Sequence, residues 1–114
     1  MKEKYIKNLH EGITFSKNGF SVFLPKIANQ EISLCFVTVE EERDNYCLLD
    51  NSTIFYYIID GTGEFEIEND KIPVKNNDLI EIPPKHKFSY KGRLKMLEIQ
   101  PNAFNENEVH EYSK

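Results

Sequence analysis

Short apolar stretches separated by turn-forming residues run along most of the chain. Where charged residues enter, they alternate with apolar ones, and Phe65 and Ile67 stand between glutamates. A period of two places apolar side chains on one face of a strand and charged ones on the other. Many short strands at close spacing indicate an all-β sandwich or barrel. Strands are expected at residues 20–25, 31–40, 46–49, 54–59, 64–68, 80–82, 88–90 and 94–99.

Turn residues divide these predicted strands. Asp60-Gly61 is a strong hairpin signal, and the glycines of Gly61-Thr62-Gly63 suit a turn that needs positive φ. Asn69-Asp70 predicts another turn, and Pro83-Pro84 ends a strand. The charged residues 40–45 are interpreted as an exposed turn.

The strand expected at residues 31–40 has two apolar faces. Leu34 and Phe36 share one face, and Cys35, Val37 and Val39 share the other. A strand without a polar face is typically covered on both sides. We therefore expect the barrel interior on one side of this strand and a further covering element on the other.

The composition narrows the classes of function. The 114 residues fit one domain, 1–114, and the net charge of −5 argues against nucleic acid as a partner. No apolar run has the length of a membrane span, and no secretory signal is recognised, so a cytoplasmic protein that does not bind membranes is expected. The two cysteines, Cys35 and Cys47, are expected to be reduced thiols.

Both ends of the chain are polar. Residues 1–12 are expected to form an arm or a short edge strand, and residues 102–114 a tail. Within the tail, Asn105 is placed to cap a short helix, with Glu108 three residues later.

The turns and prolines of the central region follow a known pattern. Gly61 stands where a first conserved block ends, Asn77-Asp78 where a second begins, and Pro83 at the proline of that second block. Lys85 takes the position of a glycine. This spacing resembles the cupin superfamily, the jelly-roll β-barrels of the RmlC-like type, over about residues 31–101. The resemblance implies a single-domain all-β cupin barrel, with a second subunit as the cover of strand 31–40, hence a homodimer.

The metal ligands that the resemblance implies, three histidines and a glutamate, are missing. Ile54 stands at the glutamate position and Phe88 at the last histidine position. Leu48 and Asp50, or Cys47 and Leu49, stand at the first two histidine positions. Apolar side chains offer no lone pair to a metal. We therefore expect a metal-free cupin without a cofactor.

An aromatic and aliphatic pocket is the leading hypothesis for the interior. It would bind a small organic ligand, and the alternative is that the same side chains form only core. Strand alternation supports a shared face for part of this set. The candidate ligand-binding residues are Tyr46, Ile54, Tyr56, Phe88 and Tyr90.

A rearranged polar site is the second hypothesis. Asp50 and His86 could form an acid–base pair, in which the carboxylate orients the imidazole, or could bind a metal together with Cys47. Such a pair would make the protein a small isomerase, epimerase or lyase acting on a sugar or small acid. Against it, His86 lies in a lysine-rich stretch typical of an exposed loop, and Asp50 starts a turn. A third hypothesis is a structural role through the barrel surface. The ligand is not specified by the sequence, because one fold carries many functions.

Overall fold

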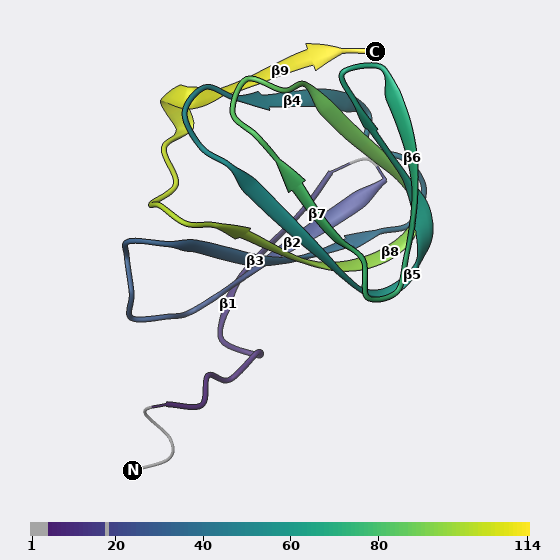
Figure 1. The fold of residues 1–114 in the computed structure, drawn as a ribbon. Helices are drawn as coiled ribbons and strands as arrows, with labels where there is room; N and C mark the ends of the chain where they lie inside the picture. The colour runs from purple at the N-terminus through teal and green to yellow at the C-terminus, as the bar shows by residue number, and fades with distance from the viewer. Residues whose placement is uncertain (1–4, 18) are drawn as a thin grey trace.

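The computed structural model describes residues 5–17 and 19–114, so the first four residues of the predicted arm lie outside it. The chain forms a curled sheet of nine strands that closes around an interior (Figure 1). This confirms the prediction of an all-β barrel. The strands are β1 (Gly12–Lys17), β2 (Phe20–Pro25), β3 (Ser33–Val39), β4 (Asn45–Leu49), β5 (Ile54–Ile67), β6 (Asp70–Lys75), β7 (Leu79–Ile82), β8 (Phe88–Gln100) and β9 (Val109–Ser113).

The strands follow one path through the sheet, with a branch at β8. The path runs β1-β2-β3-β8-β4-β9, and β5 pairs with β6, β7 and β8. All the pairings are antiparallel. The long strand β8 therefore connects both sides of the barrel, since its second half pairs with β3 and its first half reaches β4.

The predicted hairpin at Asp60-Gly61 is wrong. Strand β5 continues through these residues for 14 residues, and its register with β8 shifts between Ile58 and Asp60. Gly61 has a φ of 112°, a backbone conformation that glycine adopts easily. It therefore allows the irregularity within the strand. The chain reverses instead at Glu68 and Asn69, whose φ values are 46° and 75°.

Strands β5 and β8 form a two-stranded ribbon that folds over on itself. Tyr56 and Phe65 are nine residues apart on β5, yet their ring centroids lie 5.2 Å apart. In a straight strand, nine residues span roughly 30 Å. The ribbon is tight where Gly63 faces Gly92, because a Cβ added to Gly92 would lie 2.6 Å from the Cα of Gly63. The bend brings the two halves of each strand together across the interior.

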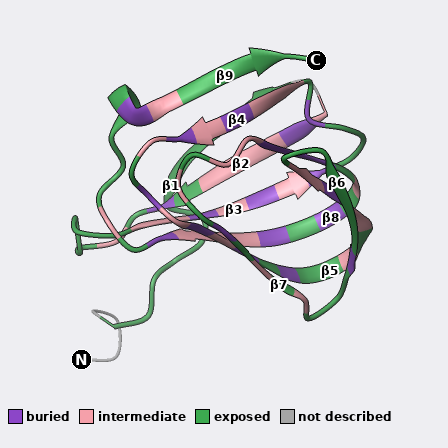
Figure 2. Cartoon of the chain, turned by 45° about the horizontal axis from the view of Figure 1, so that its top comes forward, coloured by how far each residue is buried: buried purple, intermediate pink, exposed green. Residues whose placement is uncertain are grey.

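The core fills the inside of this fold. Along β3 the buried residues are Cys35, Val37 and Val39, and the alternate residues are partly exposed (Figure 2). The inner face thus follows the predicted alternation. The outer face keeps its apolar side chains partly accessible, with Phe36 opposite Phe23 of β2 and Leu97 of β8.

The first and last strands, β1 and β9, lie at the two ends of the main strand path. Strand β9 pairs with β4 along its whole length, whereas the sequence predicted only a polar tail there. A 3-10 helix at Glu106–Glu108 precedes β9, and Asn105 caps it by accepting a hydrogen bond from Asn107 N, as predicted. Lys17 of β1 and Glu111 of β9 connect these edges through an ion pair of 3.3 Å. In the described part of the chain, no helix is long and apolar enough to cross a membrane.

Candidate functional site

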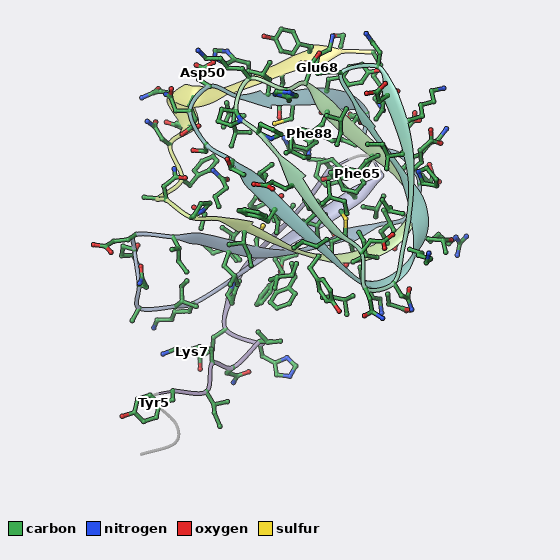
Figure 3. The ribbon with its side chains drawn as sticks, viewed as in Figure 1. Tyr5, Lys7, Asp50, Phe65, Glu68 and Phe88 are labelled. Carbon is green, nitrogen blue, oxygen red and sulfur yellow. The ribbon has the colours of Figure 1, made fainter. Side chains whose placement is uncertain are left out.

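Four aromatic rings meet in the centre of the barrel. The ring of Tyr56 lies 5.9 Å from that of Phe88 and 5.7 Å from that of Tyr90, and the Phe65 ring lies 5.3 Å from that of Tyr90. All four residues are almost completely buried. Figure 3 labels Phe65 and Phe88, which lie within the space that the ribbon encloses. Such tilted and edge-on pairs add stability beyond their buried area.

A buried arginine contacts these rings. Arg43, in the loop before β4, donates a hydrogen bond from Nη1 to the Tyr90 hydroxyl over 3.1 Å and from Nε to Asn45 Oδ1 over 2.9 Å. Its guanidinium lies 4.7 Å from the centroid of the Phe20 ring. Burial raises the pKa of Tyr90, although the charge of Arg43 acts in the opposite direction. A positive charge therefore reaches the aromatic interior, which is uncommon unless it is paired.

The pairing of Arg43 extends toward the solvent through Glu111. Arg43 Nη2 lies 3.5 Å from Glu111 Oε1, and Lys17 Nζ lies 3.3 Å from the same oxygen. Glu111 is opposite the buried Cys47 in the pairing of β4 with β9, so it shares the inner face of that sheet. Burial raises the pKa of the Cys47 thiol to about 11, and the nearby charge of Arg43 lowers it. One carboxylate thus bridges a buried and an exposed cation at the rim.

A second polar group lies on the opposite wall. Glu98 of β8 is paired with Cys35 of β3 on one side and with Tyr56 of β5 on the other. The Cys35 thiol donates to Glu98 Oε2 over 3.3 Å, and the Tyr56 hydroxyl interacts with the same carboxyl group. Burial raises the pKa of Glu98, and the hydrogen bonds of Tyr56 and Cys35 oppose this shift. Glu98 therefore faces the interior, although glutamate side chains more often face the solvent.

Four of the five predicted ligand-binding residues lie in the core. Ile54, Tyr56, Phe88 and Tyr90 are each between 1% and 4% exposed. Tyr46 lies elsewhere, because its hydroxyl donates to Glu66 Oε2 over 2.7 Å on the outside of the barrel. The hydrogen bond with Glu66 raises the pKa of Tyr46.

The structure gives Asp50 and His86 different neighbours. Asp50 Oδ2 lies 2.8 Å from His110 Nε2 at the exposed rim, where Figure 3 labels Asp50. His86 Nδ1 lies 2.9 Å from the carbonyl oxygen of Pro84. Among the residues that the structure describes, no three histidine, cysteine or acidic side chains gather in a way that could hold a metal ion. A catalytic role for the Asp50–His86 pair stays a prediction.

Two residues that stand at glycine positions of the cupin pattern have backbone conformations typical of glycine. Asn77 and Lys85 replace glycines of the conserved pattern, and their φ values are 73° and 62°. Both residues therefore have the left-handed backbone that glycine adopts most readily. The two apolar replacements, Ile54 and Phe88, lie in the core.

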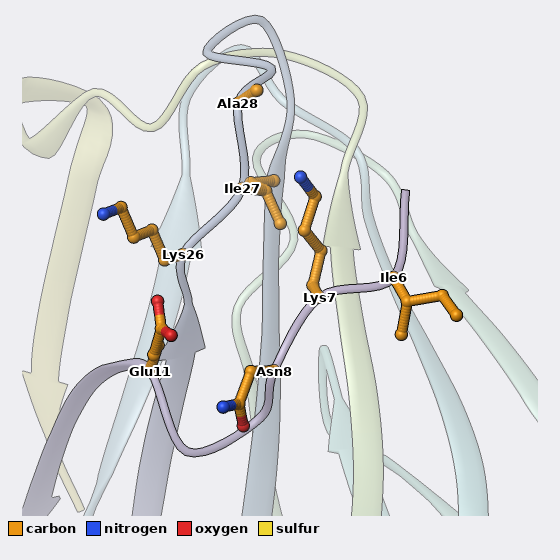
Figure 4. Close-up of a pocket in the computed structure, with 7 residues that line it drawn as sticks. All are labelled: Ile6, Lys7, Asn8, Glu11, Lys26, Ile27 and Ala28. Carbon is orange, nitrogen blue, oxygen red and sulfur yellow. The ribbon is translucent and has the colours of Figure 1, made fainter. Parts of the chain in front are cut away.

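A separate hollow lies outside the barrel. It has a volume of about 840 Å³ and is formed between the N-terminal arm and the segment after β2 (Figure 4). Its lining residues are Ile6, Lys7, Asn8, Glu11, Lys26, Ile27 and Ala28. This open hollow is distant in sequence from the aromatic rings and contributes no residue to them.

Similarity to known proteins is found at the level of structure. No protein-family model matches the chain, and no curated protein matches it by sequence. Among solved structures, Pac13, described as a unique nucleoside dehydratase, superposes with a TM-score of 0.89 at 25% identity, covering 97% of this chain and 92% of Pac13. A Streptomyces Pac13 variant with uridine, in which a histidine is replaced by glutamine, superposes with the same TM-score at 24% identity, covering 98% of this chain and 95% of that one.

More distant barrels share the same architecture. An RmlC-like cupin from Shewanella frigidimarina has a TM-score of 0.70 at 10% identity, covering 86% of this chain and 89% of that one. KdgF from a Halomonas species has a TM-score of 0.68 at 14% identity, covering 84% and 92%. This chain has a cupin fold. The predicted jelly-roll barrel is thereby confirmed, and its activity is not specified by the fold.

Sequence reasoning missed most polar residues of this cupin interior. Arg43 lies in a run of charged residues that was interpreted as an exposed turn. Lys17 and Glu111 lie in strands β1 and β9, which were not predicted. The signal that could have found Glu98 is its position, since it has the same parity in β8 as the buried Leu94 and Met96.

Proposed function

We propose that this cupin barrel binds a small organic molecule in its interior, with aromatic rings and buried polar groups in place of metal ligands. A ligand of the nucleoside type, with a planar ring and hydroxyl groups, is the class best supported. The observation that carries the proposal is the buried Arg43–Tyr90 hydrogen bond of 3.1 Å within an aromatic cluster. Binding sites for small molecules combine apolar walls with a few fixed polar groups in this way.

The neighbouring structures support the ligand class. Pac13 variants in which a tyrosine is replaced by phenylalanine are also solved with uridine, at TM-scores of 0.89 and 24% identity. The present barrel has two buried tyrosines, Tyr56 and Tyr90, at its centre. Tyrosine hydroxyls and an arginine can donate hydrogen bonds to the hydroxyl and carbonyl oxygens of a nucleoside.

Titration of the protein with uridine by isothermal calorimetry or by NMR tests the proposal. Saturable binding should be weakened about tenfold or more by Arg43→Ala, because a hydrogen bond from a charged donor contributes roughly 1.5–3 kcal/mol. Arg93→Ala is the matched control, since Arg93 is exposed on β8. No binding of uridine, cytidine or their bases at millimolar concentration would contradict the proposal.

A dehydratase activity is the second candidate, and the Lys17–Glu111–Arg43 network favours it. Loss of water from a nucleoside breaks a C–H and a C–O bond, forms a C=C bond, and needs a base for the proton and an acid for the leaving hydroxyl. Glu111 can accept a proton, and Lys17 can donate one. The three histidines lie outside the aromatic cluster, His10 and His110 being exposed and His86 bonded to a loop carbonyl.

Mass spectrometry separates this second candidate from binding alone. Incubation with nucleosides should yield products lighter by one water, and Glu111→Gln should slow this conversion. Unchanged turnover in Glu111→Gln would exclude that residue as the base. The earlier alternative, an Asp50–His86 pair acting on a sugar or small acid, predicts instead that His86→Ala abolishes turnover.

We further propose that the protein is a cytoplasmic homodimer. A row of outward apolar side chains crosses five neighbouring strands and supports a subunit interface. Directly opposed positions link each member to the next, and all are at least partly exposed. The row consists of Phe23, Phe36, Leu97, Tyr57 and Leu79.

A further inference from the structure

The inner face of strand β1 carries apolar side chains that stay accessible to solvent. Phe15 lies opposite Val22 in the pairing of β1 with β2, and Ile13 lies opposite Leu24. Directly opposed side chains share one face of a sheet, and Val22 packs against the core, so Phe15 faces inward. Phe15 is nevertheless 46% exposed, and Leu24 is 38% exposed. This accessibility follows from the position of β1, which ends the strand path and, among the described strands, pairs with β2 alone.

The Phe15 ring differs from the rings at the centre of the barrel. The central rings, such as those of Tyr56 and Phe88, pack against one another in tilted and edge-on pairs. None of the ring pairs in the barrel includes Phe15. An aromatic face that solvent reaches can stack with another planar ring. Phe15 is therefore an inward aromatic side chain that a ligand ring can contact without displacing the core.

A positive charge lies two residues further along the same face of β1. Lys17 is opposite the buried Phe20, and its Nζ donates to Glu111 Oε1 over 3.3 Å. An ammonium group has three donors, of which Glu111 takes one. The Cα atoms of residues two apart on a strand are separated by roughly 7 Å. This separation is close to that between the base and the 5′ carbon of a nucleoside.

We propose that Phe15 holds the planar ring of a nucleoside-type ligand by stacking, while Lys17 donates a hydrogen bond to an oxygen of its sugar. The ligand lies along the inner face of β1, with its sugar toward the Lys17–Glu111–Arg43 network. The inference rests on the proposed function, because it requires a ligand with a planar ring and a sugar. It goes beyond that function by assigning which residue contacts the ring and which contacts the sugar.

Two replacements of Phe15 test the stacking contact by calorimetric titration with uridine. Phe15→Leu keeps an apolar side chain but removes the aromatic face, so the Kd should rise about fivefold or more. Phe15→Tyr keeps that face, so its Kd should stay within about threefold of the wild-type value. Phe104→Leu is the matched control, since Phe104 is also exposed but lies in the segment before the 3-10 helix. Uridine binding that Phe15→Leu leaves unchanged would overturn the inference.

A fragment of the ligand tests the two ends separately by NMR titration. Binding of the free base uracil should weaken in Phe15→Leu and stay unchanged in Lys17→Met, because uracil has no sugar for Lys17 to contact. Uridine should bind more weakly to both variants. Bound uridine should also show nuclear Overhauser contacts between its base protons and the Phe15 ring, a signal that a merely structural role of Phe15 would not give. Absence of these contacts, or equal weakening of uracil binding by both variants, would overturn the assigned orientation.

Further outcomes separate this inference from the proposed function and from a subunit contact. Failure of uridine to bind the wild type would overturn both proposals. Uridine binding that Arg43→Ala weakens but that Phe15→Leu and Lys17→Met leave unchanged would overturn this inference and leave the proposed function standing. Light scattering should give Phe15→Leu the same mass as the wild type. A lower mass would assign Phe15 to an interface between copies of the chain and would overturn the inference.

Discussion

The Arg43 guanidinium donates to the Tyr90 hydroxyl over 3.1 Å, and the two residues are also joined through their backbones, since Arg43 N donates to Tyr90 O over 2.9 Å. This double connection ties the loop before β4 to the first half of β8. It also fixes the position of the only positive charge that the described structure shows against the central rings. The loop is therefore part of the interior architecture.

Removal of this arginine should destabilise the fold. Arg43→Ala leaves the Tyr90 hydroxyl without its donor and opens space beside Phe20, so the free energy of unfolding should fall by about 2 kcal/mol. Urea denaturation followed by tyrosine fluorescence measures the change. Arg93→Ala, on the exposed side of β8, should stay within about 0.5 kcal/mol of the wild type. Equal stability of the two variants would show that the buried pair contributes nothing.

Stability should decline at alkaline pH. The folded state holds the Cys47 proton more tightly than the unfolded chain does, with the pKa raised from 9.0 to about 11. The contribution of the Cys47 thiol to the free energy of unfolding is therefore fully present below pH 9. It is lost as the pH rises through the folded-state pKa of about 11. The pKa values of Cys35, Tyr56 and Tyr90 are also raised by burial, so they act in the same direction. Urea denaturation at several pH values should show this slope, and Cys47→Ala should flatten it; an unchanged slope would assign it to the other groups.

Glu98 should lower stability as it ionises. Burial raises the pKa of Glu98, so its contribution is favourable at acidic pH and is lost as the pH rises through that raised pKa. Glu98→Gln lacks this loss, so the variant should gain stability relative to the wild type between acidic and neutral pH. Thermal unfolding at several pH values measures the difference. A constant difference across that range would contradict a raised pKa.

The glycine contact in the ribbon should be intolerant of side chains. Gly92 has a φ of 119°, and an added Cβ would lie 2.6 Å from both Gly63 Cα and Thr62 O. Gly92→Ala should therefore lower the free energy of unfolding by at least about 2 kcal/mol. Lys91→Ala, next to it and exposed, serves as the control. If Gly92→Ala were as stable as the control, the tight bend would not be required.

The proposed homodimer predicts the molecular mass of the protein in solution. Light scattering at tens of micromolar should report twice the mass of one chain. Phe36→Glu, in the middle of the outward apolar row, should yield a folded monomer, because a charge is costly to bury at an interface. Asp70→Lys, at an exposed position on β6 outside the row, is the control. A wild-type monomer would contradict the proposal.

The fold was largely predictable because its strands have local signals. Alternation separated the two faces of β3 correctly, and alternation around Phe65 placed that residue on an inner face. The hairpin at Asp60-Gly61 was wrong because a dipeptide that favours a turn also permits a bulge, and only pairing with β8 decides between them. Strand β9 escaped prediction because its residues are mostly exposed and lack an apolar face.

The site was less predictable because its polar groups depend on contacts between distant segments. Arg43 follows three glutamates in a charged run, and nothing local indicates that it is buried. Glu98 faces inward only because Cys35 and Tyr56 flank it in the sheet. The apolar positions Tyr56, Phe88 and Tyr90 were placed in the interior correctly, since their alternation is a local property.

The bridge between Lys17 and Glu111 has a consequence for the order of folding. The two residues are 94 positions apart in sequence, so their contact closes nearly the longest loop that the chain allows. Contacts of such separation form late, because the entropy of loop closure must be overcome first. Pairing of β9 with β4 brings Glu111 to Lys17 and Arg43. The rim beside Arg43 is thus completed only when β9 joins the sheet.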